Sequence, residues 1–102
     1  MKTKKGKKKK AMPKLYKKIN ELLAKHGARK VSIFGSYARG EAKKSSDIDI
    51  IVEFSESKSL LDIIGIEQEL TEKLGIKVDL LTEKSISPYL IEKIREEMVV
   101  IS

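Results

Sequence analysis

Residues 30–54 decide the fold, and they read KVSIFGSYARGEAKKSSDIDIIVEF. A short apolar pattern over residues 30–34 and a longer one over residues 47–54 each predict a β-strand. Because successive side chains of a strand point to opposite faces, the second strand places aliphatic side chains on one face and begins its other face with two acids. Between the strands, Gly35-Ser36 predicts a sharp turn that opens a helix.

Helical patterns fill most of the remaining sequence. Apolar residues at helical spacing predict a first helix from Pro13 to His26, which Gly27 stops. The other predicted elements are a short helix over 37–40, a helix over 60–74, a strand over 76–80 and a helix over 87–98. Residues 99–101 fit either a short strand or simple packing against the body. The predicted fold class is α/β (α+β), a small mixed three-stranded sheet covered by about four helices. The helix over 60–74 has an apolar stripe that we assign to the core: Leu60, Leu61, Ile64, Leu70 and Leu74.

Charge separates a tail from a body. Residues 1–14 contain eight Lys and no acid, whereas the remaining chain has 14 basic and 15 acidic residues, a net charge of −1. A block of like charge predicts a basic, disordered tail over residues 1–12, and salt-sensitive attraction of nucleic acid is the alternative role for it. The 102-residue chain allows one domain, which we place at residues 13–102.

Composition excludes several classes of protein. The chain has no Cys, which excludes disulfides and thiolate metal sites. It has no uncharged apolar run approaching the roughly 18 residues of a membrane span, so we expect no membrane partner. The basic start is not followed by the apolar segment of a secretory signal peptide. A cytoplasmic location is therefore expected.

Asp47 and Asp49 are the first candidate site residues. They lie one residue apart on one face of a strand, where two like charges are costly unless one protonates or a cation lies between them. Asp79 adds a third acid, on the outward face of the next predicted strand. Carboxylate oxygens with open positions suit Mg²⁺, and three acids can hold two metal ions about 3.5–4 Å apart, with Mn²⁺ as the alternative ion.

Gly35, Ser36 and Arg39 are candidates for binding a polyphosphate. Gly lets the backbone approach a phosphate closely, the start of a helix offers free N–H groups, and the Ser hydroxyl adds a donor. The planar guanidinium of Arg39 can reach a phosphate from the same side. Each feature alone has an ordinary explanation: solvent-facing acids at strand ends, a tight turn with a Ser cap, and a surface Arg. Together they describe one site that binds phosphates beside metal ions.

Three other residues are weaker candidates. His26 ends the first helix, where a partial positive charge suits the helix dipole. Tyr37 could stack on a base or contact a partner, although packing at the surface is the simpler interpretation. Glu53 shares the acid face but lies some 13 Å from Asp49, at roughly 3.3 Å per residue, so we do not expect it to bind the metal.

The joint motif is similar to that of a known family. Gly35-Ser36, followed after ten residues by the acids of 47–49, resembles the signature of the DNA polymerase beta-like nucleotidyltransferase superfamily. The fuller forms of the two motifs, GSYARG and SDID, are similar to those of the minimal nucleotidyltransferases of prokaryotes. Asp79 matches the third acid of that pattern, and the resemblance covers residues 13–98.

The resemblance implies a role for each candidate residue. Asp47 and Asp49 would bind the metal ions, and Asp79 would complete the triad and orient or deprotonate the incoming hydroxyl. Gly35 and Ser36 would hold the triphosphate of ATP. Family members are reported as antitoxins that transfer AMP to a tyrosine of a HEPN-domain ribonuclease toxin. The resemblance therefore implies a HEPN toxin as the partner of this chain, in a type VII-like toxin–antitoxin pair.

Two functions of other classes stay open at this point. The chain could be an antitoxin that neutralises its toxin by binding alone, although the presence of all three acids argues against an inactive site. It could also be a nucleic-acid-binding module that acts through the Lys-rich tail. In that case removal of residues 1–11 would abolish binding, and binding by the tail would weaken with salt.

Overall fold

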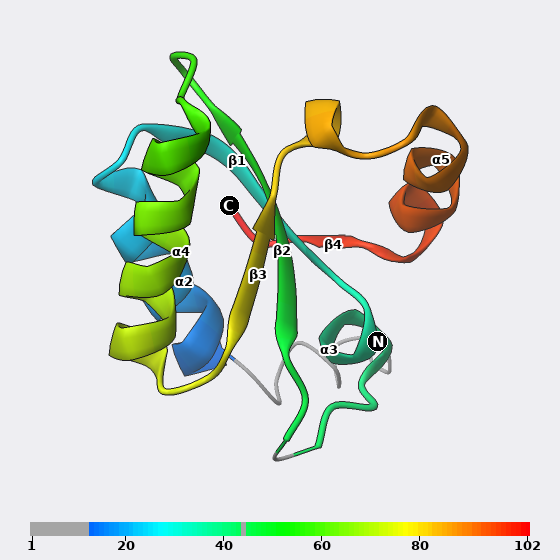
Figure 1. Cartoon of the computed structure of the whole chain (residues 1–102). Helices are drawn as coiled ribbons and strands as arrows, with labels where there is room; N and C mark the ends of the chain where they lie inside the picture. The colour runs from blue at the N-terminus through cyan, green and yellow to red at the C-terminus, as the bar shows by residue number, and fades with distance from the viewer. Residues whose placement is uncertain (1–12, 44) are drawn as a thin grey trace.

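The computed structural model describes residues 13–43 and 45–102 (Figure 1). The predicted tail, residues 1–12, lies outside the described residues, so its role and the domain boundary stay predictions. The described elements follow this order: α2 (Pro13–Ala24), β1 (Ala28–Phe34), α3 (Ser36–Arg39), β2 (Ile48–Phe54), α4 (Leu60–Leu74), β3 (Val78–Leu81), the 3-10 turn η1 (Glu83–Ser85), α5 (Pro88–Glu97) and β4 (Val99–Val100).

The strands form one mixed sheet in the order β3-β2-β1-β4. β1 pairs antiparallel with β2 and β4, and β2 pairs parallel with β3. A parallel neighbour requires a long crossover, which α4 supplies. The predicted mixed sheet and its four helices are confirmed.

The predicted number of three strands is wrong, because residues 99–100 add a fourth. Val99 and Val100 pair with Ile33 and Ser32 of β1. The N–H of Ile101 donates to the carbonyl of Val31 over 2.9 Å, which extends the contact by one residue. An edge strand presents unpaired backbone groups, and here the end of the chain satisfies part of that edge.

α2 and α4 cover one face of the sheet, and α5 lies on the other side (Figure 1). The hydrophobic core fills the space between the sheet and the α2–α4 layer. Ile48, Ile50 and Val52 alternate along β2 and are fully buried in this core. The odd-numbered residues of β2, Asp49 among them, therefore face the α5 side. The other buried hydrophobic residues of the core are Tyr16, Ile19, Leu22, Leu23, Val31, Ile33, Tyr37, Ala38, Ile66, Leu70, Val78 and Leu80.

Helix α4 begins and ends where the sequence predicts. Ser59 and Asp62 form a reciprocal capping box, and Gly75 closes the helix in the left-handed conformation. The predicted core stripe is only partly correct, because some of its residues lie on a different side of the helix from Leu70. Ile66 and Leu70 are buried, whereas three residues assigned to the core from the pattern are exposed: Leu60, Leu61 and Ile64.

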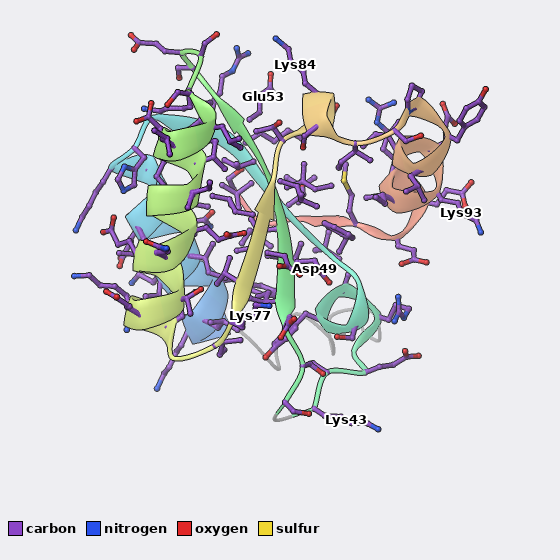
Figure 2. All side chains as sticks on the ribbon, in the orientation of Figure 1. Lys43, Asp49, Glu53, Lys77, Lys84 and Lys93 are labelled. Atoms are coloured by element: carbon purple, nitrogen blue, oxygen red, sulfur yellow. The ribbon has the colours of Figure 1, made fainter. Side chains whose placement is uncertain are left out.

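α5 packs loosely. Among the described residues of this helix none is buried, and Tyr89 at its start is 90% exposed. An ion pair between Arg95 and Glu83, at 3.0 Å, connects the helix to η1. Side chains fill the space between α5 and the sheet (Figure 2), where Ile51 is buried on the acid-bearing face. No helix in the described part of the chain is long and apolar enough to span a membrane.

The two leucines Leu23 and Leu61 test the position of the core. Leu23 is fully buried and Leu61 is 79% exposed, although both lie in helices. We expect Leu23→Ala to lower the free energy of unfolding by ~2–5 kcal/mol, because it removes buried contacts and leaves a cavity. Leu61→Ala should change it by no more than ~0.5 kcal/mol. Urea titration measures both values, and equal losses would contradict the described packing.

Candidate active site

The three predicted acids lie at one end of the parallel strand pair. Asp49 of β2 stands in register with Asp79 of β3, on neighbouring strands of the same sheet. Asp47 comes two residues earlier, just before β2 begins. All three carboxylates are half-buried rather than fully solvated. The sequence predicted this meeting from the alternation of each strand, but the register that sets Asp49 opposite Asp79 comes from the structure.

Burial and two neighbouring acids raise the pKa of Asp49 from its ordinary value of 3.8 to about 6. Burial is the largest cause, followed by the charge of Asp79 and a hydrogen bond to it, and then by the charge of Asp47. The charge of Arg39 acts in the opposite direction and lowers the pKa. Like charges this close disfavour full ionisation unless another cation joins them.

The Gly35 turn packs directly against Asp49. β1 ends at Phe34, which is in register with Asp49, and Gly35 then adopts φ 77° and ψ −151°. A Cβ on Gly35 would overlap the Oδ2 atom of Asp49 and lie 3.3 Å from its Cγ. Only glycine meets both the positive φ and the close approach. The predicted phosphate turn and the predicted metal acids therefore belong to one site.

Two buried side chains hold the short helix α3 against the core. Its residues Tyr37 and Ala38 are buried in the core, and Gly40 ends the helix in the left-handed conformation. The surface position expected for Tyr37 is wrong, because its side chain is only 9% exposed. This burial removes Tyr37 as a residue that stacks on a base, and it fixes the orientation of Ser36, which is half-buried at the start of α3.

Arg39 is exposed and held by two carboxylates. Its Nε donates to Oε1 of Glu41 over 2.9 Å, and its Nη1 donates to Oε1 of Glu97 over 3.3 Å. The hydrogen bond to Glu41 is the largest cause that raises the pKa of Arg39 above its usual value. The sequence indicated Arg39 but not Glu97, because 58 residues separate them and no local pattern connects α5 to α3.

The carboxylates of Asp47, Asp49 and Asp79 are of the type that binds a divalent cation, but they do not surround one. Within residues 13–43 and 45–102, no group of three or more His, Asp or Glu side chains is gathered tightly enough to hold a metal ion as it stands. Burial, followed by the charges of Asp79 and Asp47, raises the pKa of Asp49, and a bound cation would favour its charged form. Oxygen ligands of this kind suit Mg²⁺ with additional ligands from water and substrate.

The other acids and the histidine lie elsewhere. Glu53 is at the opposite end of β2 from Asp49 (Figure 2) and pairs with Arg29 at 3.9 Å. His26 bonds to Glu69 of α4 at 2.9 Å, which gives it a structural partner. Neither residue contributes to the Asp49 site, as the sequence predicted.

Most of the chain matches a family of enzymes. Residues 15–101 match the family model described as a nucleotidyltransferase domain. The chain therefore belongs to the nucleotidyltransferase domain family, and the predicted class of enzyme is confirmed.

Individual relatives narrow this class. A Methanocaldococcus jannaschii protein, provisionally named a protein adenylyltransferase, is 55% identical over 83 residues, which are 81% of this chain and 89% of that protein. A toxin–antitoxin crystal structure with AMP-PNP contains a chain that matches with a TM-score of 0.78 at 27% identity, covering 85% of this chain and 72% of that chain. A structure of a tri-AMPylated Shewanella oneidensis HEPN toxin with an MNT antitoxin matches with a TM-score of 0.70 at 25% identity, covering 85% and 68%. The resemblance to the minimal nucleotidyltransferases is confirmed.

The contact between Gly35 and Asp49 gives a direct test of the site. In Gly35→Ala the new methyl group would overlap the Asp49 carboxylate, and we expect nucleotidyl transfer to fall by ~100-fold or more because the acid is displaced. Gly75→Ala is the matched control, since its φ is +71° but a Cβ there meets nothing within 4 Å. Gly75→Ala should lose ~1–2 kcal/mol of stability through left-handed backbone strain. Gly35→Ala should lose more, because its φ and ψ are nearly restricted to glycine and its methyl group meets Asp49, and only this variant should lose activity. Equal activity in the two variants would contradict the proposed packing.

The raised pKa of Asp49 predicts how stability depends on pH in the metal-free protein. Its folded pKa of about 6 lies above its ordinary value of 3.8, so the folded state binds more protons between these values. The contribution of Asp49 to the free energy of unfolding must then decrease as pH rises from about 4 to about 6, and level off above. Asp49→Asn removes this decrease, and we expect its thermal midpoint relative to wild type to rise across the same window.

Glu53→Gln serves as the control for that experiment, because it removes a carboxylate of β2 outside the Asp49–Asp79 pair. We expect it to keep the wild-type slope. Thermal unfolding in EDTA at several pH values measures all three proteins. Parallel curves for Asp49→Asn and wild type would show that the acids do not repel each other in the folded state.

Proposed function

We propose that this chain is a metal-dependent adenylyltransferase that transfers AMP from ATP to a tyrosine hydroxyl of a partner HEPN toxin. The proposal makes the chain the antitoxin of a type VII-like toxin–antitoxin pair. The observation that carries it is the placement of Asp49 opposite Asp79 and against the Gly35 turn. The solved structure that pairs a tri-AMPylated HEPN toxin with an MNT antitoxin supports the choice of acceptor.

The residues of this site suit transfer at the α-phosphorus of ATP. Asp79 would orient the incoming hydroxyl and accept its proton. The hydroxyl oxygen then forms a bond to the α-phosphorus, and the bond to the β-phosphate oxygen breaks, which releases pyrophosphate. Mg²⁺ or Mn²⁺, held by Asp47 and Asp49, would neutralise charge that develops on the phosphates.

The turn and the arginine would bind the phosphates. Gly35 would bind a phosphate through its backbone, since Asp49 occupies the space that a Cβ would take. Ser36 would offer a hydroxyl donor at the start of α3. Arg39 supplies a planar cation that suits phosphate oxygens. AMP-PNP, an ATP analogue, is present in the toxin–antitoxin structure to which this chain is similar, which supports ATP as the nucleotide.

The intact mass of the toxin tests the proposal. The chain is incubated with ATP, Mg²⁺ and the product of the neighbouring gene, which the proposal expects to be a HEPN toxin. We expect that toxin to gain the mass of one or more AMP groups. Asp47→Asn should reduce the rate of this gain by ~100-fold or more, because a neutral amide cannot hold the cation that stabilises the transferred phosphate. Glu53→Gln, which removes an acid outside the site, should leave the rate unchanged.

Neutralisation of the toxin separates this function from its closest rival. If Asp47→Asn fails to modify the toxin but still abolishes its ribonuclease activity, the chain acts by binding alone. If neither wild type nor variant adds AMP in the presence of Mg²⁺ or Mn²⁺, the transfer reaction itself is excluded. Peptide mapping of the modified toxin then identifies the acceptor, and modification of a residue other than tyrosine would correct the proposed target.

A further inference from the structure

The end of α5 contacts Arg39, the residue proposed to bind a nucleotide phosphate, through one hydrogen bond. Glu97 is the last residue of α5, and its Oε1 accepts a hydrogen bond from Nη1 of Arg39. Glu41 accepts from Nε of the same guanidinium on another side. Two carboxylates from different segments therefore hold one exposed arginine, whose side chain is 45% exposed.

We propose that Glu97 is a positioning residue that holds the guanidinium of Arg39 in place to receive a nucleotide phosphate. The inference deepens the function proposed above and rests on it. It assigns to α5 a part in nucleotide binding, although the helix itself contributes no phosphate ligand in this scheme.

The two hydrogen bonds of Arg39 hold its guanidinium and still leave N–H donors for a phosphate. The recorded bonds of Arg39 use Nε and Nη1, and neither uses Nη2. A guanidinium carries five N–H donors, so two carboxylates at these positions leave donors for a phosphate.

The contribution of this contact is expected in binding more than in folding. Exposed ion pairs stabilise a fold only weakly, and both Arg39 and Glu97 are about half exposed, at 45% and 48%. A long exposed side chain loses rotamer freedom when a ligand fixes it, and a side chain that is already held loses less. Removal of Glu97 should therefore weaken nucleotide binding without unfolding the chain.

The packing of α5 bears on how the Arg39–Glu97 contact is held. Within the described residues, no side chain of the helix is fully buried, and Arg95–Glu83 connects it to η1. Its last residue, Glu97, lies two residues before Val99, which pairs with Ile33 of β1. The sheet therefore holds the end of α5 that contacts Arg39.

The dissociation constant of Mg²⁺–AMP-PNP, measured by calorimetry on the full chain, tests the inference. We expect Glu97→Gln to raise this constant about two- to five-fold, which corresponds to about 0.4–1 kcal/mol. Glu96→Gln is the matched control, since it makes the same change on the neighbouring exposed residue, and it should bind as wild type does. In the transfer assay, Glu97→Gln should raise KM for ATP and leave kcat unchanged.

A double-mutant cycle separates positioning from a general effect on α5. In an Arg39→Ala background, Glu97→Gln should have no further effect, because there is no guanidinium left to hold. A loss that persists in this background would overturn the inference in favour of a structural role. Equal binding by Glu97→Gln and Glu96→Gln, or tighter binding by Glu97→Gln, would also overturn it.

The same measurements keep the inference separate from the proposed function. If wild type binds AMP-PNP and the Glu97 variants behave as wild type, only the positioning role fails. If wild type does not bind the nucleotide at millimolar concentration, the proposed function fails and the positioning role falls with it.

Discussion

The close pairing of Asp49 with Asp79 is the interaction on which the rest of the site depends. Parallel pairing of β2 and β3 sets the two acids opposite each other, and burial adds to the cost of keeping both charged. The opposite face of the same strands offsets this cost, because Ile48 and Ile50 of β2 and Val78 of β3 are buried there. Alternation along each strand thus couples a stabilising apolar face to a repulsive acidic one. Proteins tolerate such local conflict where a ligand resolves it.

Helix α4 sets the position of Asp79 as well as covering the core. The outer edge of β3 has no further strand in the described sheet, yet its N–H groups are satisfied. Thr71 Oγ1 accepts from the N–H of Val78 over 3.1 Å, and Glu67 Oε2 accepts from the N–H of Leu80 over 2.8 Å. These bonds flank Asp79 on both sides. The crossover that makes β3 parallel to β2 therefore also anchors the strand that carries the third acid, which explains why so short a strand can hold a charged side chain in register.

Local patterns in the sequence were enough to predict most of the elements and the candidate acids, but not the contacts between distant segments. Strand alternation indicated Asp47, Asp49 and Asp79 as candidates, and the Ser59 cap with Gly75 agrees with the predicted limits of α4. The sequence could not decide between a fourth strand and simple packing for Val99 and Val100. Their pairing depends on the free edge of β1, which no local pattern reveals. The burial of Tyr37 depends on how a four-residue helix packs on the core. The exposure of Leu61 follows from helical spacing, because Leu61 lies about two and a half turns before the buried Leu70 and so on the opposite side of α4.

The division of the molecule into two sides explains how so small a body can hold a strained site. The α2–α4 side contains nearly all the buried apolar side chains, and the Arg39–Glu97 and Arg95–Glu83 pairs on the α5 side are exposed. The stability of the fold and the geometry of the site then depend on different residues. β2 connects the two sets, because its side chains alternate between the core and the acid-bearing face. A shift of α5 can alter the surroundings of Arg39 while the core stays intact, because exposed ion pairs reform at little cost. The acids, in contrast, stay fixed by the sheet, so the site combines a rigid acidic half with an adjustable basic half.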